Sequence, residues 1–145
     1  MRVQRGAARI VLMALSGAYL WGVAWMTLRT RPYGEDITNA LNRLLTWFAE
    51  HPSTAWITFD RVEFAANVVM FVPLGILAVL WFGVRGWWSA PLIGAIVSAA
   101  IESAQALFLT SRVPDLRDIV ANTLGAVIGM LLMLLLAFLL LPRRS

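Results

Sequence analysis

Residues Leu124–Leu141 read LGAVIGMLLMLLLAFLLL, and this stretch decides the fold of the chain. It contains no charged, amide or hydroxyl side chain, so every side of a helix formed here would be apolar. Roughly 20 mainly apolar residues are enough for a helix to cross the hydrocarbon core of a bilayer. Together with the residues just before it, the stretch predicts a transmembrane helix over about 119–141.

Three earlier segments have the length and composition of membrane spans, at about 8–28, 62–82 and 88–109. The chain of 145 residues is 60% hydrophobic and 14% charged, whereas soluble domains average about 45–50% and about 25%. A soluble core of this size would leave apolar surface in water, so lipid must cover the excess. The predicted fold is all-α: a single integral membrane four-helix bundle over residues 1–145, with one long external loop at 29–61.

The first span has a second interpretation, because Arg2, Arg5 and Arg9 precede an apolar run as in a secretory signal peptide. The apolar run is longer than a usual signal core. Trp21 and Trp25 near its far end are typical of a membrane–water interface. These features favour a retained helix over a cleaved one.

The arginines predict the orientation of the spans. All 12 basic residues are arginine, and four spans divide them equally between the two sides of the membrane. One group lies in short tails and a short turn, where the positive-inside rule acts most strongly, so both termini are predicted to be cytoplasmic at the plasma membrane. Scattered arginines at helix ends indicate lipid headgroups as partners, and not nucleic acid. The cytoplasmic group is Arg2, Arg5, Arg9, Arg85, Arg143 and Arg144.

The external loop 29–61 contains an amphipathic helix, because its apolar residues recur at intervals of three and four. Asp36 is its predicted N-cap, and Pro52 follows its predicted end. We expect this helix to lie flat in the outer headgroup layer; packing against the outer rim of the bundle is the alternative, and both placements can hold together. The apolar stripe consists of Ile37, Leu41, Leu44, Leu45 and Phe48.

Polar side chains from three spans fall in the outer half of the membrane. A charge at the centre of a spanning helix costs about 2.5–3.5 kcal/mol on insertion scales, so these positions are informative. Amides are typical of hydrogen bonds that hold helices together, whereas Glu102 is a functional candidate because it is ionisable. Arg112 is its first candidate partner, and Asp118 is either a member of the cluster or the N-cap of the last span. The predicted cluster comprises Asn67, Glu102, Gln105, Arg112, Asp115, Asp118 and Asn122.

Close helix packing is predicted from small residues and proline. The last span carries a G-x-x-x-G pair, which permits close approach of two helices. The proline of the second span either opens space beside Asn67 or only bends the helix. The predicted packing residues are Pro73, Gly75, Gly125 and Gly129.

The third and fourth spans are connected by a short loop and are expected to form an antiparallel hairpin. Counting back from the loop brings Glu102 level with about Gly125, and Gln105 level with about Asn122. In this register the glycine would leave room for the carboxylate.

Three segments resemble the VanZ-like membrane protein family: ANVVMFVPLGILAVL at 66–80, IESAQALF at 101–108 and SRVPDLRDIVANTLGAVIGM at 111–130. The resemblance implies a small integral membrane protein. The namesake of the family is associated with lowered susceptibility to the glycopeptide teicoplanin. The matching positions are Asn67, Phe71, Pro73, Gly75, Glu102, Gln105, Arg112, Asp118, Asn122, Gly125 and Gly129.

The favoured functional hypothesis is a non-enzymatic cell-envelope protein related to glycopeptide resistance. Its outward-facing polar cluster would bind a lipid-linked headgroup, such as that of a cell-wall precursor, or a glycopeptide. No cofactor or metal is predicted, because the chain has no cysteine and no metal-ligand spacing.

Two other functions stay open. A membrane enzyme would act on a lipid-phosphate or acyl substrate, with Glu102, Asp115 or Asp118 as acid, base or nucleophile. Against an enzyme, the one histidine, His51, lies in the external loop, so no Ser-His-Asp set can be assembled. His51 is better explained as a residue at the end of the amphipathic helix. No catalytic residue is therefore assigned. A proton or solute pathway through Glu102 is disfavoured, because the inner half of the last span is rich in leucine.

Overall fold

The structure, a computed structural model, describes residues 2–28, 34–109 and 115–140. These residues form helices and connecting turns, which confirms the predicted all-α class. The helices are α1 (Arg2–Thr27), α2 (Glu35–Glu50), α3 (Phe59–Phe82), α4 (Ser89–Phe108) and α5 (Leu116–Leu140), with a short 3-10 helix η1 (Val84–Gly86) between α3 and α4.

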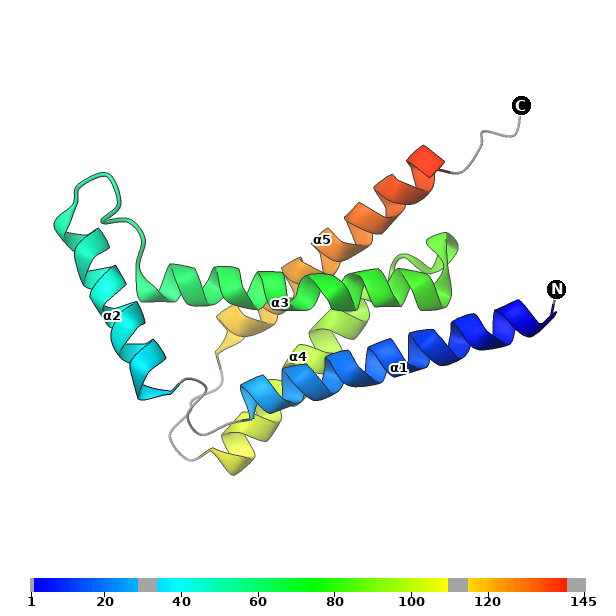
Figure 1. The fold of residues 1–145 in the computed structure, drawn as a ribbon, viewed down its shortest axis with the longest axis horizontal. Coiled ribbons are helices and arrows are strands. Elements are labelled where there is room, and N and C mark those ends of the chain that lie inside the picture. Colours follow the sequence, from blue (N-terminus) through cyan, green and yellow to red (C-terminus); the bar gives the residue numbers. More distant parts are fainter. Residues whose placement is uncertain (1, 29–33, 110–114, 141–145) are drawn as a thin grey trace.

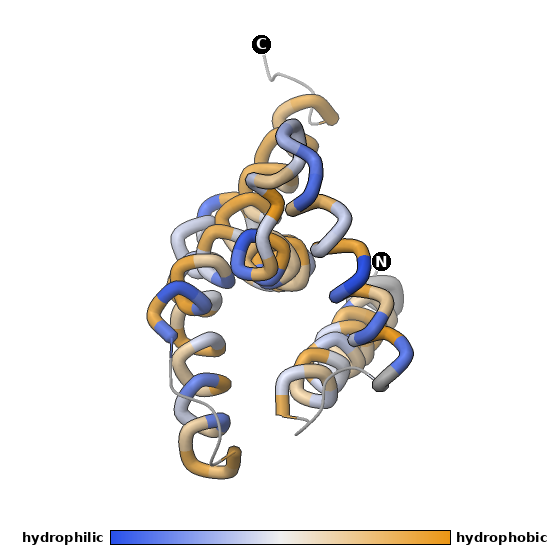
Figure 2. The backbone as a smooth tube through the Cα atoms, turned by 90° about the vertical axis from the view of Figure 1, so that its left-hand side faces the viewer, coloured by the Kyte–Doolittle hydropathy of each residue, from blue (hydrophilic) through white to orange (hydrophobic). Residues whose placement is uncertain are grey.

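Four of these helices are long and apolar enough to cross a membrane, namely α1, α3, α4 and α5. The candidate spans, which are Gly6–Thr27 within α1 and the whole of α3, α4 and α5, end within one helical turn of the predicted bounds. The final turns of α5 are uniformly hydrophobic, as the orange tube leading to the C-terminal end shows in Figure 2.

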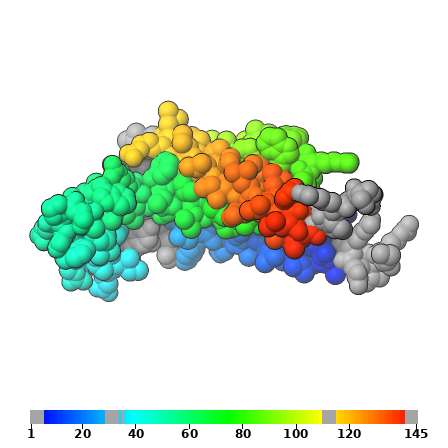
Figure 3. Space-filling model, turned by 90° about the horizontal axis from the view of Figure 1, so that it is seen from above, coloured from blue at the N-terminus to red at the C-terminus, as the bar shows by residue number. Residues whose placement is uncertain are grey.

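The start of α1, the helix η1 and the end of α5 lie at one end of the molecule (Figure 1). The opposite end carries α2, the start of α3 and the end of α4. Seen from above, the same arrangement places α2 (cyan) at one tip of an elongated body and the start of α1 (blue) with the end of α5 (red) at the other (Figure 3). The end that carries α2 is called the α2 end below.

The tightest packing in the molecule joins α3 to α5, and glycine makes it possible. A Cβ atom on any of three glycines would collide with a backbone carbonyl of the other helix. A G-x-x-x-G pair permits two helix backbones to approach this closely. The side chain of Pro73, in contrast, is exposed on the surface of α3. The glycine–carbonyl pairs are Gly75 with Ala126, Gly125 with Val68, and Gly129 with Val72.

The predicted register between α4 and α5 is wrong. Asn122 of α5 donates a hydrogen bond from Nδ2 to Oγ of Ser98 on α4, at 2.8 Å. Glu102, one turn from Ser98, therefore comes level with Asp118 and not with Gly125. The helices are displaced by about two turns from the simple hairpin, because Gly94 lets α4 approach Ala126 and the glycine pair of α5 faces α3 instead.

The predicted N-cap of α2 is also wrong, and of the two alternatives for Asp118 the N-cap does not hold. Extended Gly34 is the N-cap of α2, so Asp36 lies within the first turn, where a negative charge interacts favourably with the helix dipole. At the start of α5, Oδ1 of Asp115 accepts the backbone N–H of Arg117 at 2.8 Å, which is the N-cap interaction. Asp118 is thereby left to interact with the other spans.

The C-terminal end of α2 agrees with the interpretation of His51. The helix ends at Glu50, and His51 is its C-cap, with Nδ1 2.7 Å from the carbonyl oxygen of Trp47. Pro52 follows the end, where a residue without a backbone N–H is common.

Candidate functional site

Asp118 lies at the junction of three spans. Its Oδ1 accepts a hydrogen bond from Nδ2 of Asn67 on α3, at 2.8 Å. Its carboxyl group lies near that of Glu102 on the facing turn of α4. One side chain in the first turn of α5 is therefore placed near both neighbouring helices, which became possible because Asp115 provides the N-cap.

Glu102 is the most deeply placed acidic group of the cluster, with 7% of its surface exposed. Its Oε2 accepts the backbone N–H of Asp115 at 3.0 Å, so the residue that caps α5 also covers the carboxylate. The carboxyl group of Asp118 lies near it on the facing turn of α5. The site is thus rich in hydrogen-bond acceptors.

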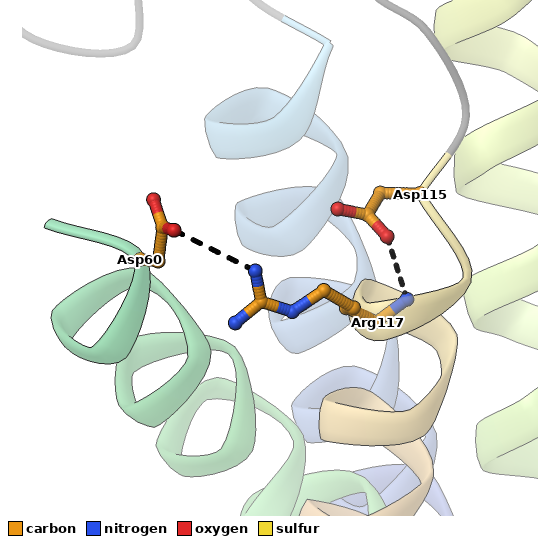
Figure 4. A network of polar contacts seen from close by, with 3 residues as sticks. All are labelled: Asp60, Asp115 and Arg117. Atoms are coloured by element: carbon orange, nitrogen blue, oxygen red, sulfur yellow. Dashed lines mark hydrogen bonds and ion pairs between the residues drawn. The ribbon is translucent and has the colours of Figure 1, made fainter.

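Above the acceptors lies an exposed ion pair at the α2 end. Nη1 of Arg117 is 3.7 Å from Oδ2 of Asp60, which joins the first turn of α5 to the first turn of α3. Figure 4 shows the guanidinium of Arg117 directed at Asp60 while its backbone N–H faces Asp115. Both side chains of the pair are more than half exposed, so water screens the attraction and the pair can open at low cost.

One helical turn deeper, Ser98 and Asn122 form the inner limit of the polar cluster. Ser98 is fully buried and Asn122 is 4% exposed. Oδ1 of Asn122 has no hydrogen-bond partner among the described residues. A buried acceptor without a partner is uncommon in native structures and adds to the acceptor-rich character of the cluster.

Gln105 does not join the other predicted site residues. Its side chain is buried, and Nε2 donates to the carbonyl oxygen of Thr27 at 2.8 Å. It therefore fixes the end of α1 to α4, as expected for an amide between helices. Two further bonds hold α1: the hydroxyl of Tyr19 donates to the carbonyl of Met70 at 2.9 Å, and Nε1 of Trp81 donates to Oγ of Ser16 at 3.0 Å.

The structure thus brings Asn67, Glu102, Asp115, Asp118 and Asn122 to one region at the α2 end. Arg112 lies outside the described residues. The described part of the chain contains no group of three or more acidic, histidine or cysteine residues arranged to hold a metal ion.

Sequence reasoning missed Asp60 and Ser98 as members of the cluster. Asp60 was assigned to the external loop, although an acid in the first turn of a span lies at the same level as the first turn of α5. Ser98 precedes Glu102 by four residues, which places both on one face of the helix. This spacing is the signal by which the Ser98 hydroxyl could have been identified from the sequence.

Comparison with known proteins gives one match. A family model described as VanZ/LLP1 covers residues 16–138, which include all the residues of the cluster. Neither the curated proteins nor the solved structures contain a match to the chain.

Proposed function

The chain belongs to the VanZ/LLP1 family, and we propose that it is a plasma-membrane protein that binds a polar headgroup at its α2 end without altering it chemically. The α2 end faces outward in this proposal and the termini are cytoplasmic. Support for the orientation comes from the arginines of the tails and the η1 turn, which follow the positive-inside rule.

The observation that carries the proposal is the placement of Glu102. An ionisable side chain within a span is costly, by about 2.5–3.5 kcal/mol for a charge at the helix centre, and marks a functional site by default. Glu102 is buried, yet its Oε2 accepts the backbone N–H of the exposed residue Asp115, and the exposed Asp60–Arg117 pair involves a residue only two positions further along α5. A group approaching from outside would thus meet a weak ion pair first and buried acceptors next.

The chemistry of the cluster suggests the kind of headgroup. Arg117 offers an exposed guanidinium, which forms charge-assisted hydrogen bonds with phosphate when Asp60 is displaced. Glu102 and the deeper Asn122 offer acceptors for hydroxyl, amide or ammonium donors. A lipid-linked cell-wall precursor carries both phosphate and such donors. A glycopeptide such as teicoplanin supplies hydroxyl, amide and ammonium donors, so the two ligands share the deeper half of the proposed interaction.

Binding to the purified protein in nanodiscs tests the proposal. The probes are undecaprenyl pyrophosphate with and without its disaccharide-peptide, and teicoplanin. Glu102→Gln keeps the shape of the side chain but removes the charge. A hydrogen bond to a charged group contributes about 1.5–3 kcal/mol, so affinity should fall by about tenfold or more. Glu50→Gln, at an exposed position on α2, is the matched control and should bind as the unmodified protein does.

The outcomes separate the ligand sources. Binding of the pyrophosphate lipids that also falls with Arg117→Gln supports a phosphate-bearing headgroup, whereas binding of teicoplanin alone assigns the glycopeptide. Equal affinities for Glu102→Gln and Glu50→Gln would remove the basis of the proposal. Arg85→Gln, in the turn at the opposite end, is the control for Arg117→Gln.

The proximity of the carboxyl groups of Glu102 and Asp118, on facing turns of α4 and α5, also favours a second candidate function. Paired carboxyl groups share a proton and can act as acid and base, as in several hydrolases. In this alternative the protein is a membrane enzyme that acts on a lipid-phosphate or acyl substrate. Product release from the same lipid probes, abolished by Glu102→Gln or Asp118→Asn, would favour the enzyme over the binding protein.

A further inference from the structure

The helix α2 stands apart from the bundle. In Figure 1 it lies at the far left, directed across α3 and not along it. Among the described residues, the helix pairs that pack extensively all come from α1, α3, α4 and α5. The first of the two placements that the sequence left open, a helix at the membrane surface, is therefore favoured over packing on the rim of the bundle.

The two long faces of α2 differ in chemistry. On the apolar stripe, Ile37 is 59% exposed and Leu44 is 49% exposed, while Leu41, Leu45 and Phe48 are partly buried. At 100° per residue, the polar positions lie on the opposite side of the same helix. All five of these polar residues are exposed: Asn39, Asn42, Arg43, Thr46 and Glu50.

Aromatic residues lie at two places: between the apolar and polar faces of α2, and in the corner, the turn that connects α2 to α3. Trp47 lies between the apolar and polar faces, 49% exposed, with its ring against those of Phe48 and His51. Trp56 is 61% exposed in the corner, where Arg61 donates to its carbonyl oxygen and lies over its ring. Tryptophan is enriched where apolar chains meet water, because its ring is apolar and its N–H is polar.

The charge of α2 restricts the lipid that it can meet. Its sequence contains three acidic residues, Glu35, Asp36 and Glu50, against one basic residue, Arg43. Attraction to anionic headgroups depends on clustered Lys or Arg. Insertion of this helix must therefore depend on its apolar stripe and its tryptophans.

We propose that α2 lies in the surface of the outer leaflet of the same bilayer that the four spans cross. The apolar stripe enters between the acyl chains, the polar face meets water, and lipids without net charge are sufficient. The covalent continuity of α2 with α3 supports this placement, because only eight residues separate the end of α2 from Phe59, where the apolar surface of α3 begins. The proposal is independent of the ligand proposed for the polar cluster.

Single cysteines test the placement, since the chain has none of its own. Leu44→Cys on the apolar stripe and Asn42→Cys on the polar face are labelled with an environment-sensitive fluorophore in full-length protein. The proteins are placed in phosphatidylcholine vesicles, and brominated lipid and aqueous iodide serve as quenchers. Brominated lipid should quench the Leu44→Cys label several-fold more than the Asn42→Cys label, and iodide should show the reverse order.

Three results would overturn the proposal. Equal quenching of both labels by iodide would place α2 in water. Protection of the Leu44→Cys label from both quenchers would show that protein, either the bundle or a second copy, covers the stripe. If the two labels differ in quenching only after phosphatidylglycerol is added, the proposal that uncharged lipids are sufficient would be wrong. Ile37→Cys repeats the stripe measurement if Leu44→Cys does not insert.

Discussion

Replacement of Gly129 by alanine should weaken the α3–α5 interface strongly. The added Cβ would collide with the backbone carbonyl of Val72 and lie 3.0 Å from the nitrogen of Ile76. Backbone atoms cannot rotate away as a flexible side chain can, so the helices must separate. Overpacking usually costs about 1–3 kcal/mol, and a backbone neighbour favours the upper part of that range, so we expect a loss of about 3 kcal/mol.

The matched control is Gly22→Ala on α1. Nothing lies within 4 Å of the Cβ position there, and the helix gains the better helix former. Alanine in place of glycine stabilises an unobstructed helix by about 0.4–1 kcal/mol. The free energy of unfolding is measured in mixed micelles with increasing SDS, followed by the fluorescence of the 7 tryptophans. If Gly129→Ala is as stable as Gly22→Ala, the close approach of α3 and α5 is incorrect.

Two further substitutions test the outer cluster in the same unfolding assay. Asp115→Ala should cost about 1 kcal/mol because α5 loses its N-cap, whereas Asp115→Asn should keep most of the stability; equal losses would contradict the cap. Asn67→Leu should cost about 0.6–1.7 kcal/mol, as interhelical hydrogen bonds in membranes do, and should add little when Asp118→Ala has already removed the acceptor. Additive losses for Asn67→Leu and Asp118→Ala would mean that the two side chains do not interact.

The spans could be predicted from the sequence because lipid imposes one simple requirement on them. A helix such as α5 must be apolar over its whole length, and hydropathy alone reveals that property. The placement of Asn67, Glu102 and Asp118 in the same outer half of the membrane followed from counting residues, since each helix rises by about 1.5 Å per residue, but the shared level of Glu102 and Asp118 did not. Depth along a span is a one-dimensional quantity, and the sequence contains it.

Contacts between spans were harder to predict, because they depend on how each helix is rotated about its own axis and how far it is shifted along its neighbours. The pair Gly125 and Gly129 predicts that some helix approaches closely, but both α3 and α4 were available. The predicted hairpin register assumed that this glycine pair faces α4, whereas in the structure it faces α3. The N-cap of α5 shows the same limit, because Asp115 and Asp118 are both suitable residue types and only the backbone geometry selects Asp115.

The depth of the innermost polar pair, Ser98 and Asn122, bears on whether a proton or solute could cross the bundle. Within the described residues, the cluster ends at Ser98 and Asn122, and the next buried layers toward the other end are apolar or small: Ala78, Val79, Ala90, Gly94, Ala126 and Met130. A proton or solute crossing the membrane would need successive polar partners through this region. Ser89, near the far end of α4, is separated from Ser98 by more than two turns, too far for a direct hydrogen bond. The described residues therefore provide no continuous polar path from the cluster to the opposite end of the bundle.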